Sequence, residues 1–158
     1  MSEKILLITG ASSGIGKATA YLAVKKGYKV ALVARSEDKL NNIASELGES
    51  NALAIACDIT KLENIAQAVR KTIEKFGKID AVFANAGVGL NKPGTENGDP
   101  KEWEDLIDLN IKALLWTAKV SLPYLKENKG HFIITSSVAG KIHLPGSVYG
   151  ASKWFASG

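Results

Sequence analysis

A tyrosine and a lysine near the end of the sequence have the spacing of a proton-transfer pair. Tyr149 and Lys153 are four residues apart, so they share one face of a helix that we expect to begin near Ser147. A phenol titrates at about pH 10, so it exchanges protons poorly at neutral pH unless a nearby cation lowers its pKa. Lys153 would supply that cation. By spacing alone, an ordinary pair on a helix surface is the more common explanation.

A serine upstream strengthens the chemical interpretation. Ser137 precedes Tyr149 by twelve residues and lies near the end of a predicted strand. The intervening loop could bring its hydroxyl over the crevice that the tyrosine faces. Together the two hydroxyls would form a donor set for a carbonyl oxygen.

Three glycines near the N-terminus indicate an anion site. Gly10, Gly14 and Gly16 follow an apolar strand and open a helix, so backbone amides and the helix N-terminus meet at the carboxyl end of that strand. This place suits a pyrophosphate. The spacing is GxxxGxG rather than GxGxxG, so a tight turn without a ligand remains the alternative.

Two charged residues follow the next strands. An acid at the end of the second strand would bind a ribose 2′-hydroxyl, whereas Arg35 stands there and could pair with a 2′-phosphate, which favours NADP(H) over NAD(H). A solvated loop charge is the alternative for Arg35. Asp58 ends the third strand, where its carboxylate could accept from an adenine amino group or only shape the turn before Thr60.

Short apolar runs alternate with segments of helical periodicity, which predicts an α/β fold with a doubly wound parallel sheet in the strand order 3-2-1-4-5. The expected strands are Ile5–Thr9, Lys29–Ala34, Ala52–Cys57, Ala81–Ala84 and His131–Ser136. The expected helices are Gly14–Lys26, Glu37–Leu47, Lys61–Phe76 and Pro100–Asn128.

Local signals support these helix boundaries. Thr60 to Glu63 reads as a capping box, and Asp99 followed by Pro100 reads as an N-cap with a first-turn proline. Gly27, Gly48 and Gly77 stand where C-caps belong. The glycine-rich loop of residues 87–99 is long enough to form the rim of a site.

Composition limits the class of protein. The 158 residues, 46% of them hydrophobic, are enough for one domain, over residues 1–158. The net charge of +4 comes from scattered lysines, which argues against a nucleic-acid partner. Cys57 is the only cysteine, so no internal disulfide or cysteine-based metal cluster is possible, and we expect it to be a buried strand residue in a reducing compartment.

Two further predictions concern metal and membrane. His131 and His143 lack partnering cysteines, so ordinary roles are expected and no metal is predicted. The apolar run before Thr9 is far too short to span a membrane and has no cleavage-site pattern. We therefore expect a soluble, cytoplasmic protein without a membrane partner.

Five motifs, in this order along the chain, closely resemble the short-chain dehydrogenase/reductase family. They are TGASSGIG at 9–16, ANAGVG at 84–89, LN at 109–110, SSVAG at 136–140 and YGASK at 149–153. The resemblance implies a Rossmann-like domain, a nicotinamide cofactor and a small-molecule carbonyl/alcohol substrate pair.

The resemblance also implies roles for the residues at the matching positions. Tyr149 is similar to the general acid of reduction and general base of oxidation, Lys153 to its pKa-lowering and ribose-binding partner, and Ser137 to the serine that polarises the carbonyl, with Ser136 fitting less well. Asn110 resembles the residue that holds a water in a proton relay. The implied cofactor contacts are Gly10, Ser12, Ser13, Gly14, Ile15, Gly16, Arg35, Asp58, Asn85, Ala86, Gly87, Tyr149 and Lys153.

Three departures from the family pattern matter. Many NADP-preferring members have a basic residue at the position of Ser13, which leaves Arg35 as the evident 2′-phosphate ligand. Ala84 stands where a first asparagine often precedes Asn85, a change that we expect to be tolerated because the position faces the core. Family members continue well beyond the position of Gly158 with two further strands, so the chain resembles a C-terminally incomplete, N-terminal portion.

The resemblance leaves two functional hypotheses open. The first is an NADP(H)-dependent oxidoreductase, and the second is an inert nucleotide-binding fragment or remnant of such an enzyme. A methyltransferase is disfavoured, because it has no use for the pair of Tyr149 and Lys153. A chain ending at Gly158 would leave the fifth strand as an unpaired edge, so we expect it to associate or aggregate. The long helix around Trp103 to Asn128 has spare apolar surface for a homo-oligomer contact.

Overall fold

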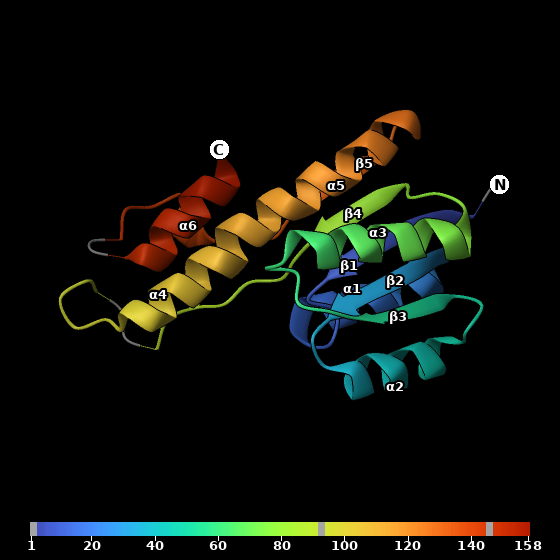
Figure 1. Ribbon diagram of the computed structural model, residues 1–158, viewed down its shortest axis with the longest axis horizontal. Coiled ribbons are helices and arrows are strands. Elements are labelled where there is room, and N and C mark those ends of the chain that lie inside the picture. Colours follow the sequence, from blue (N-terminus) through green and yellow to red (C-terminus); the bar gives the residue numbers. More distant parts are fainter. Residues whose placement is uncertain (1–2, 92–93, 145–146) are drawn as a thin grey trace.

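Five parallel strands form one sheet in the order β3-β2-β1-β4-β5 (Figure 1). The computed structural model describes residues 3–91, 94–144 and 147–158. The strands are β1 (Lys4–Thr9), β2 (Tyr28–Ala34), β3 (Ala52–Ala56), β4 (Ala81–Ala84) and β5 (His131–Ile134). The predicted fold class and strand order are confirmed, with strand ends differing from prediction by one or two residues.

The helices connect and cover these strands. They are α1 (Gly14–Lys25), α2 (Glu37–Leu47), α3 (Leu62–Phe76), α4 (Pro100–Ile107), α5 (Ala113–Glu127) and α6 (Val148–Ser157). A 3₁₀ turn, η2 (Val138–Gly140), follows β5. The helix predicted over Pro100–Asn128 is drawn as one continuous helical ribbon in Figure 1. A π-helical turn, η1 (Asp108–Lys112), separates α4 from α5 within it. Such turns occur often at functional sites, and this one contains Asn110.

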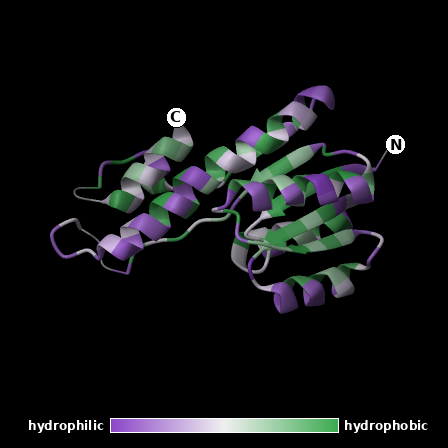
Figure 2. Ribbon diagram, viewed as in Figure 1, coloured by the Kyte–Doolittle hydropathy of each residue, from purple (hydrophilic) through white to green (hydrophobic). Residues whose placement is uncertain are grey.

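Each face of the sheet has its own apolar layer. Leu7 and Val82 pack with Ile65 of α3 on one face, and Ile8 and Leu32 pack with α1 and α2 on the other. Alternate residues of a strand point to opposite faces, so nearly continuous apolar strands are what a sheet covered on both sides requires. In Figure 2 the strands are mostly green, whereas α2 and α3 show purple along their lengths. Ala84 is buried, as predicted.

Helix boundaries follow the predicted signals in part. Asp99 caps α4, since its Oδ1 accepts the Lys101 N–H at 2.9 Å. The capping box over Thr60 and Glu63 is wrong: α3 begins at Leu62, and the hydroxyl of Thr60 donates to Asp58 instead of capping the helix. Gly77 ends α3 in the left-handed region at φ 85°.

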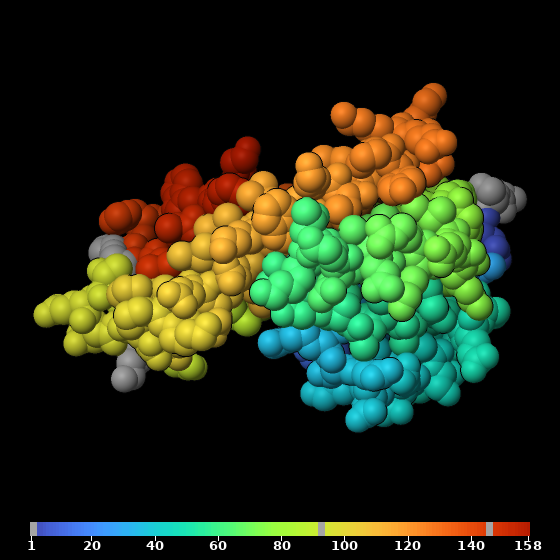
Figure 3. Space-filling view, viewed as in Figure 1, coloured from blue at the N-terminus to red at the C-terminus, as the bar shows by residue number. Residues whose placement is uncertain are grey.

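Helices α4 and α6 project together beyond the sheet (Figures 1 and 3). The rim predicted over residues 87–99 joins β4 to α4, and residues 92 and 93 of it lie outside the described part of the chain. Two residues of α4 hold this loop: Glu102 accepts from the Asn91 side chain at 2.6 Å, and the Trp103 indole packs on Gly98. Among the described helices, none has the length and apolar character needed to cross a membrane.

Candidate functional site

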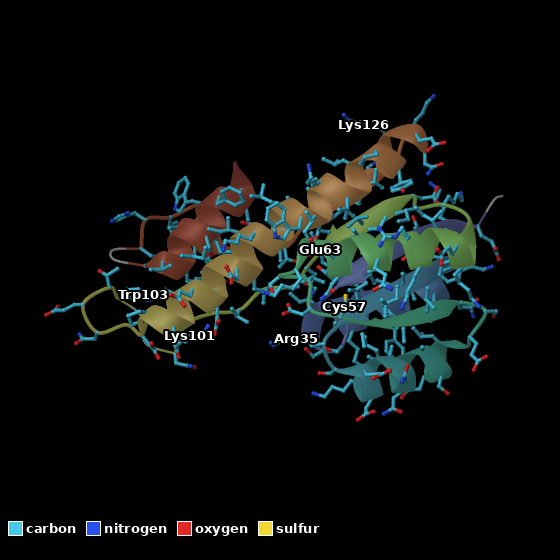
Figure 4. All side chains as sticks on the ribbon, viewed as in Figure 1. Arg35, Cys57, Glu63, Lys101, Trp103 and Lys126 are labelled. Carbon is cyan, nitrogen blue, oxygen red and sulfur yellow. The ribbon has the colours of Figure 1, made fainter. Side chains whose placement is uncertain are left out.

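A groove of about 1030 Å³ runs across the carboxyl ends of the strands. Its walls come from the start of α1, the ends of β2, β3 and β4, and the facing sides of α4 and α6. Figure 4 shows Arg35, from the end of β2, and Lys101, from α4, on opposite sides of it. In Figure 3 it opens between the yellow atoms of α4 and the light-blue atoms that follow β2. A groove at this edge is where open α/β sheets bind ligands.

The glycine turn is packed too tightly for side chains at two positions. Gly10 has φ +67°, and a Cβ there would lie 2.9 Å from the Ala86 Cα. A Cβ on Gly16 would lie 2.4 Å from the Gly10 carbonyl oxygen and 2.7 Å from Asn85 Nδ2. The glycines therefore let the first turn of α1 approach β1 and the end of β4.

The N-terminus of α1 has the features of an anion site. Ser13, the N-cap residue, makes no side-chain cap hydrogen bond, and the first turn contains no acid. The first intrahelical N–H of α1 is that of Lys17, which donates to the Ser13 carbonyl at 3.1 Å. The N–H groups of Gly14, Ile15 and Gly16 in the first turn therefore have no intrahelical acceptor, and the helix dipole adds positive potential there. Gly10, Ser12, Ser13, Gly14 and Ile15 line the groove, and Gly16 is buried beneath it.

Asn85 joins three strand ends at the floor of the groove. Its Nδ2 donates to the Thr9 carbonyl at 3.2 Å, and its Oδ1 accepts from the Thr135 hydroxyl at 2.9 Å. Thr9 Oγ1 accepts the backbone N–H groups of Asn85 and Ala86 at 3.0 and 3.1 Å. The groups that follow β1, β4 and β5 are thereby held in one arrangement, with Asn85, Ala86 and Gly87 on the groove.

Lys153 is a buried cation at the α6 end of the groove. Only 7% of the residue is exposed, and its Nζ donates to the Thr135 carbonyl at 3.1 Å. The Nζ lies 5.7 Å from the centroid of the Tyr149 ring, one helical turn earlier. Within the described residues, Lys153 has no carboxylate within salt-bridge distance. A buried ammonium without an anionic partner is costly, which points to a role other than stability.

Asn110 connects the π-helical turn to the loop after β4 and to α6. Its Oδ1 accepts the Val88 N–H at 2.9 Å and its Nδ2 donates to the Val88 carbonyl at 2.9 Å. The same Nδ2 donates to Ser152 Oγ at 3.1 Å, and the Ser152 hydroxyl donates to the Tyr149 carbonyl at 2.7 Å. Asn110 does not line the groove itself. It lies directly behind Gly87, where a Cβ would be 3.2 Å from its Oδ1.

The two serines after β5 differ in their surroundings. Ser137 is the N-cap of η2, and its Oγ accepts the Ala139 N–H at 3.2 Å. Ser136 lines the groove, whereas Ser137 does not. The hydroxyl of Ser136 is hydrogen-bonded to α6, at 2.6 Å from Ser157 Oγ.

Arg35, Asp58 and Lys61 lie at the other end of the groove. Partial burial raises the pKa of Asp58, but hydrogen bonds from the Thr60 N–H and hydroxyl, at 3.0 and 2.8 Å, and the charges of Arg35 and Lys61 outweigh it. The net effect lowers the pKa of Asp58, so it is a carboxylate at neutral pH. Of the described residues, none provides Arg35 with a carboxylate within salt-bridge distance.

Cys57 differs from the prediction of a buried strand residue. It follows β3, donates its N–H to the Ala34 carbonyl at 2.9 Å, and is half-buried on the groove. Burial, together with the nearby Asp58 carboxylate, raises the pKa of its thiol. Over the described ranges, His, Cys, Asp and Glu side chains form no cluster that could hold a metal ion.

Sequence reasoning missed three hydroxyl residues that support the site. Thr9, Thr135 and Ser152 all hold groove residues by hydrogen bonds, and Thr9 and Ser152 are 2% and 1% exposed. The available signal was their position, because Thr9 and Ser152 lie within the motifs at 9–16 and 149–153 and Thr135 directly precedes the motif at 136–140.

The family model described as short chain dehydrogenase matches residues 4–158. An uncharacterized oxidoreductase of Listeria monocytogenes is 45% identical over 98% of this chain, and this chain spans 63% of that relative's length. A second uncharacterized oxidoreductase, from Staphylococcus aureus, is 37% identical over 97% of this chain, and the match covers 67% of that relative's length.

Two solved structures are similar to this chain in both fold and sequence. An alcohol dehydrogenase from Thermococcus sibiricus, complexed with 5-hydroxy-NADP, superposes with a TM-score of 0.92 at 35% identity, over 98% of this chain and 67% of that one. A 3-ketoacyl-(acyl-carrier-protein) reductase from Brucella melitensis, complexed with NADH, superposes with a TM-score of 0.90 at 32% identity. The superposition covers 96% of this chain and 65% of that one.

The lowered pKa of Asp58 predicts a specific pH dependence of stability. Because its pKa is lower in the folded chain than its unfolded value of about 3.9, it stabilises the fold above that value, and the contribution disappears as pH falls through the folded pKa. D58N should therefore lose part of the acid dependence of the unfolding free energy, measured by urea denaturation below about pH 5. Parallel curves for the two proteins over that range would contradict the assignment.

Proposed function

Because the chain belongs to the short-chain dehydrogenase family, we propose that it is an NADP(H)-dependent oxidoreductase that transfers hydride between nicotinamide and a carbonyl or secondary alcohol. One observation carries this proposal: the buried Lys153 ammonium lies 5.7 Å from the Tyr149 ring, in a groove that begins at the uncapped start of α1. A proton-transfer pair and an anion site thus share one groove. A bound dinucleotide would extend along the groove from the start of α1 to the pair of Tyr149 and Lys153.

The residues present fit a nicotinamide dinucleotide. The free N–H groups at the start of α1 would hold the pyrophosphate, and Asp58 would accept from the adenine amino group. The backbone of Asn85, Ala86 and Gly87 would lie along the cofactor, and Lys153 would bind the ribose hydroxyls. When bound, the nicotinamide supplies or accepts the hydride.

The catalytic roles follow from hydroxyl and ammonium chemistry. Tyr149 would donate a proton to the carbonyl oxygen in reduction and accept it in oxidation, with the Lys153 charge stabilising the phenolate. Ser137 would polarise the same oxygen, because its Oγ accepts from the Ala139 N–H and its own proton has no acceptor among residues 3–91, 94–144 and 147–158.

Asn110 would support a proton relay from Lys153. A cavity of about 10 Å³ is lined by Asn110, Lys153, Thr117 and Thr135. This volume is close to that of a single water, and the lining offers several polar partners. A water in this cavity would lie between the Lys153 ammonium and Asn110, and it would be the first member of a proton relay that leads from Lys153 to solvent.

The preference for NADP(H) rests on Arg35. An exposed guanidinium beside the groove, without a carboxylate partner in the described part of the chain, is available for bidentate pairing with a 2′-phosphate. The similar solved structures contain 5-hydroxy-NADP in one case and NADH in the other, so they favour neither cofactor. We also propose a cytoplasmic location, on the basis of a single cysteine in 158 residues.

Replacing Tyr149 with phenylalanine tests the catalytic assignment. Y149F keeps the ring but loses the proton, so kcat for NADPH oxidation in a carbonyl screen should fall about 10²–10⁴-fold while NADPH binding is kept. Tyr28, at the far end of β2 from the groove, provides the matched control, and Y28F should behave as wild type. A wild-type chain that binds NADPH yet reduces no carbonyl would indicate nucleotide binding without turnover.

Charge reversal at Arg35 tests the cofactor preference. Charged hydrogen bonds contribute about 1.5–3 kcal/mol, so R35D should weaken NADPH binding about tenfold to a hundredfold and leave NADH binding unchanged or stronger. Nicotinamide fluorescence titration measures both affinities. Arg70, on α3 away from the groove, is the other arginine of the chain, and R70D serves as the control. Equal losses for the two cofactors would refute the assignment.

We further propose that two copies associate through the long helix. Leu115 and Leu122 on α5 are 47% and 39% exposed, and Trp154 on α6, which packs on α4 and η1, is 51% exposed. Replacing both leucines with glutamate should shift the sedimentation coefficient of the wild type to that of a monomer. The same substitution at Leu22 of α1, which is 57% exposed, should leave assembly intact. A wild-type chain that sediments as a monomer at all concentrations would rule out the contact.

A further inference from the structure

The proposed catalytic groups come from two separate elements. Ser137 lies at the start of η2, whereas Tyr149 and Lys153 lie on α6. Lys141 to Leu144, which follow η2, are exposed. Direct contacts between η2 and α6 are therefore the means by which the described residues can set the relative position of the serine and the tyrosine.

A short chain of hydroxyl groups makes such a contact. Ser157 Oγ donates to the Lys153 carbonyl at 2.9 Å, and Ser136 Oγ lies 2.6 Å from Ser157 Oγ and 3.3 Å from the same carbonyl. A hydroxyl has one proton, so with the proton of Ser157 directed to Lys153, that of Ser136 is directed to Ser157. The end of β5 is thus hydrogen-bonded to the last turn of α6.

Gly140 allows η2 to approach α6 closely at the same point. A Cβ there would lie 2.4 Å from the Lys153 carbonyl oxygen and 2.6 Å from Ser157 Oγ. No side chain can occupy that space unless the backbone moves. We call this contact the serine clamp, and it consists of Ser136, Gly140, the Lys153 carbonyl and Ser157.

Lys153 is consequently held from both of its ends by consecutive residues after β5. Its Nζ donates to the Thr135 carbonyl at 3.1 Å, and its own carbonyl takes part in the serine clamp with Ser136. Such two-point attachment restricts both translation and rotation of α6 relative to the strand end.

We propose that Ser136 and Ser157 are positioning residues that set the distance between the Ser137 hydroxyl and the pair of Tyr149 and Lys153. This inference rests on the proposed oxidoreductase function. Ser136 lines the groove, but its proton is engaged by α6, so it serves the geometry of the site while Ser137 remains free to donate to substrate. Ser157 does not line the groove and acts only through position.

The test compares alanine and threonine at the two serines. A misplacement of catalytic groups by about 1 Å can cost about 10²-fold, so S157A and S136A should each lower kcat by about tenfold or more, with the Kd for NADPH within about twofold of wild type. S157T and S136T keep the hydroxyl and should restore kcat. The double alanine variant should lose no more than the worse single variant, because both serines belong to one chain of hydrogen bonds.

Two further variants separate position from general damage. G140A keeps both hydroxyls but pushes η2 from α6, so it should lower kcat in the same way as S157A. S45A removes an exposed serine of α2 and should match wild type. Thermal unfolding of every variant, measured in parallel, identifies any loss of kcat that follows loss of folded protein.

The outcomes distinguish this inference from the proposed function. A wild-type chain that reduces carbonyls, with S157A and S136A equally active, overturns the positioning role and leaves the oxidoreductase proposal standing. Threonine variants as impaired as the alanine variants also overturn it, because the hydroxyl would then not be the determinant. A wild-type chain without turnover overturns the oxidoreductase proposal, and the positioning role with it.

Discussion

The side-chain amide of Asn85 holds together the strand ends on which the groove is built. It donates to the carbonyl of Thr9, before the glycine turn, and accepts from Thr135, whose own carbonyl holds the Lys153 ammonium. A one-residue shift of β4 would turn this amide to the opposite face of the sheet and separate both partners. The glycine turn at the start of α1 and the pair of Tyr149 and Lys153 on α6 therefore depend on one side chain in one register.

Several polar groups converge on α6 around the buried Lys153. An ammonium that is 7% exposed needs acceptors and a fixed environment, since an unsatisfied buried charge is strongly destabilising. Thr135 supplies an acceptor, the π-helical turn supplies Asn110, and Ser152 connects Asn110 to the Tyr149 carbonyl. The Thr135 carbonyl thus holds the Lys153 ammonium, while Asn110 and Ser152 hold the backbone of Val88 and Tyr149 beside it.

Local sequence signals predicted most helix and strand boundaries, but they did not predict the start of α3 or the π-helical turn. The strands and the Asp99 cap were predicted because apolar runs and capping residues act within a few residues. The capping box at Thr60 failed because α3 begins one residue later than the box requires, so that Lys61 is the N-cap and the Thr60 hydroxyl donates to Asp58 in the preceding turn. The π-helical turn at Asp108–Lys112 was missed because helical periodicity looks the same on both sides of it, and the Asn110 contact to Val88 that accompanies it is long-range.

The sequence by itself determined the parallel sheet, its strand order and the identity of the groups that could bind a dinucleotide and move a proton, since these follow from periodicity, spacing and motif. Only the tertiary structure decided which of those groups meet. Contacts between segments far apart in the chain bury Lys153 and place Asn110 behind the groove. Such contacts also give Ser136 and Ser137 their different surroundings. Such contacts arise from packing and hydrogen-bond satisfaction in three dimensions, which short-range patterns do not encode.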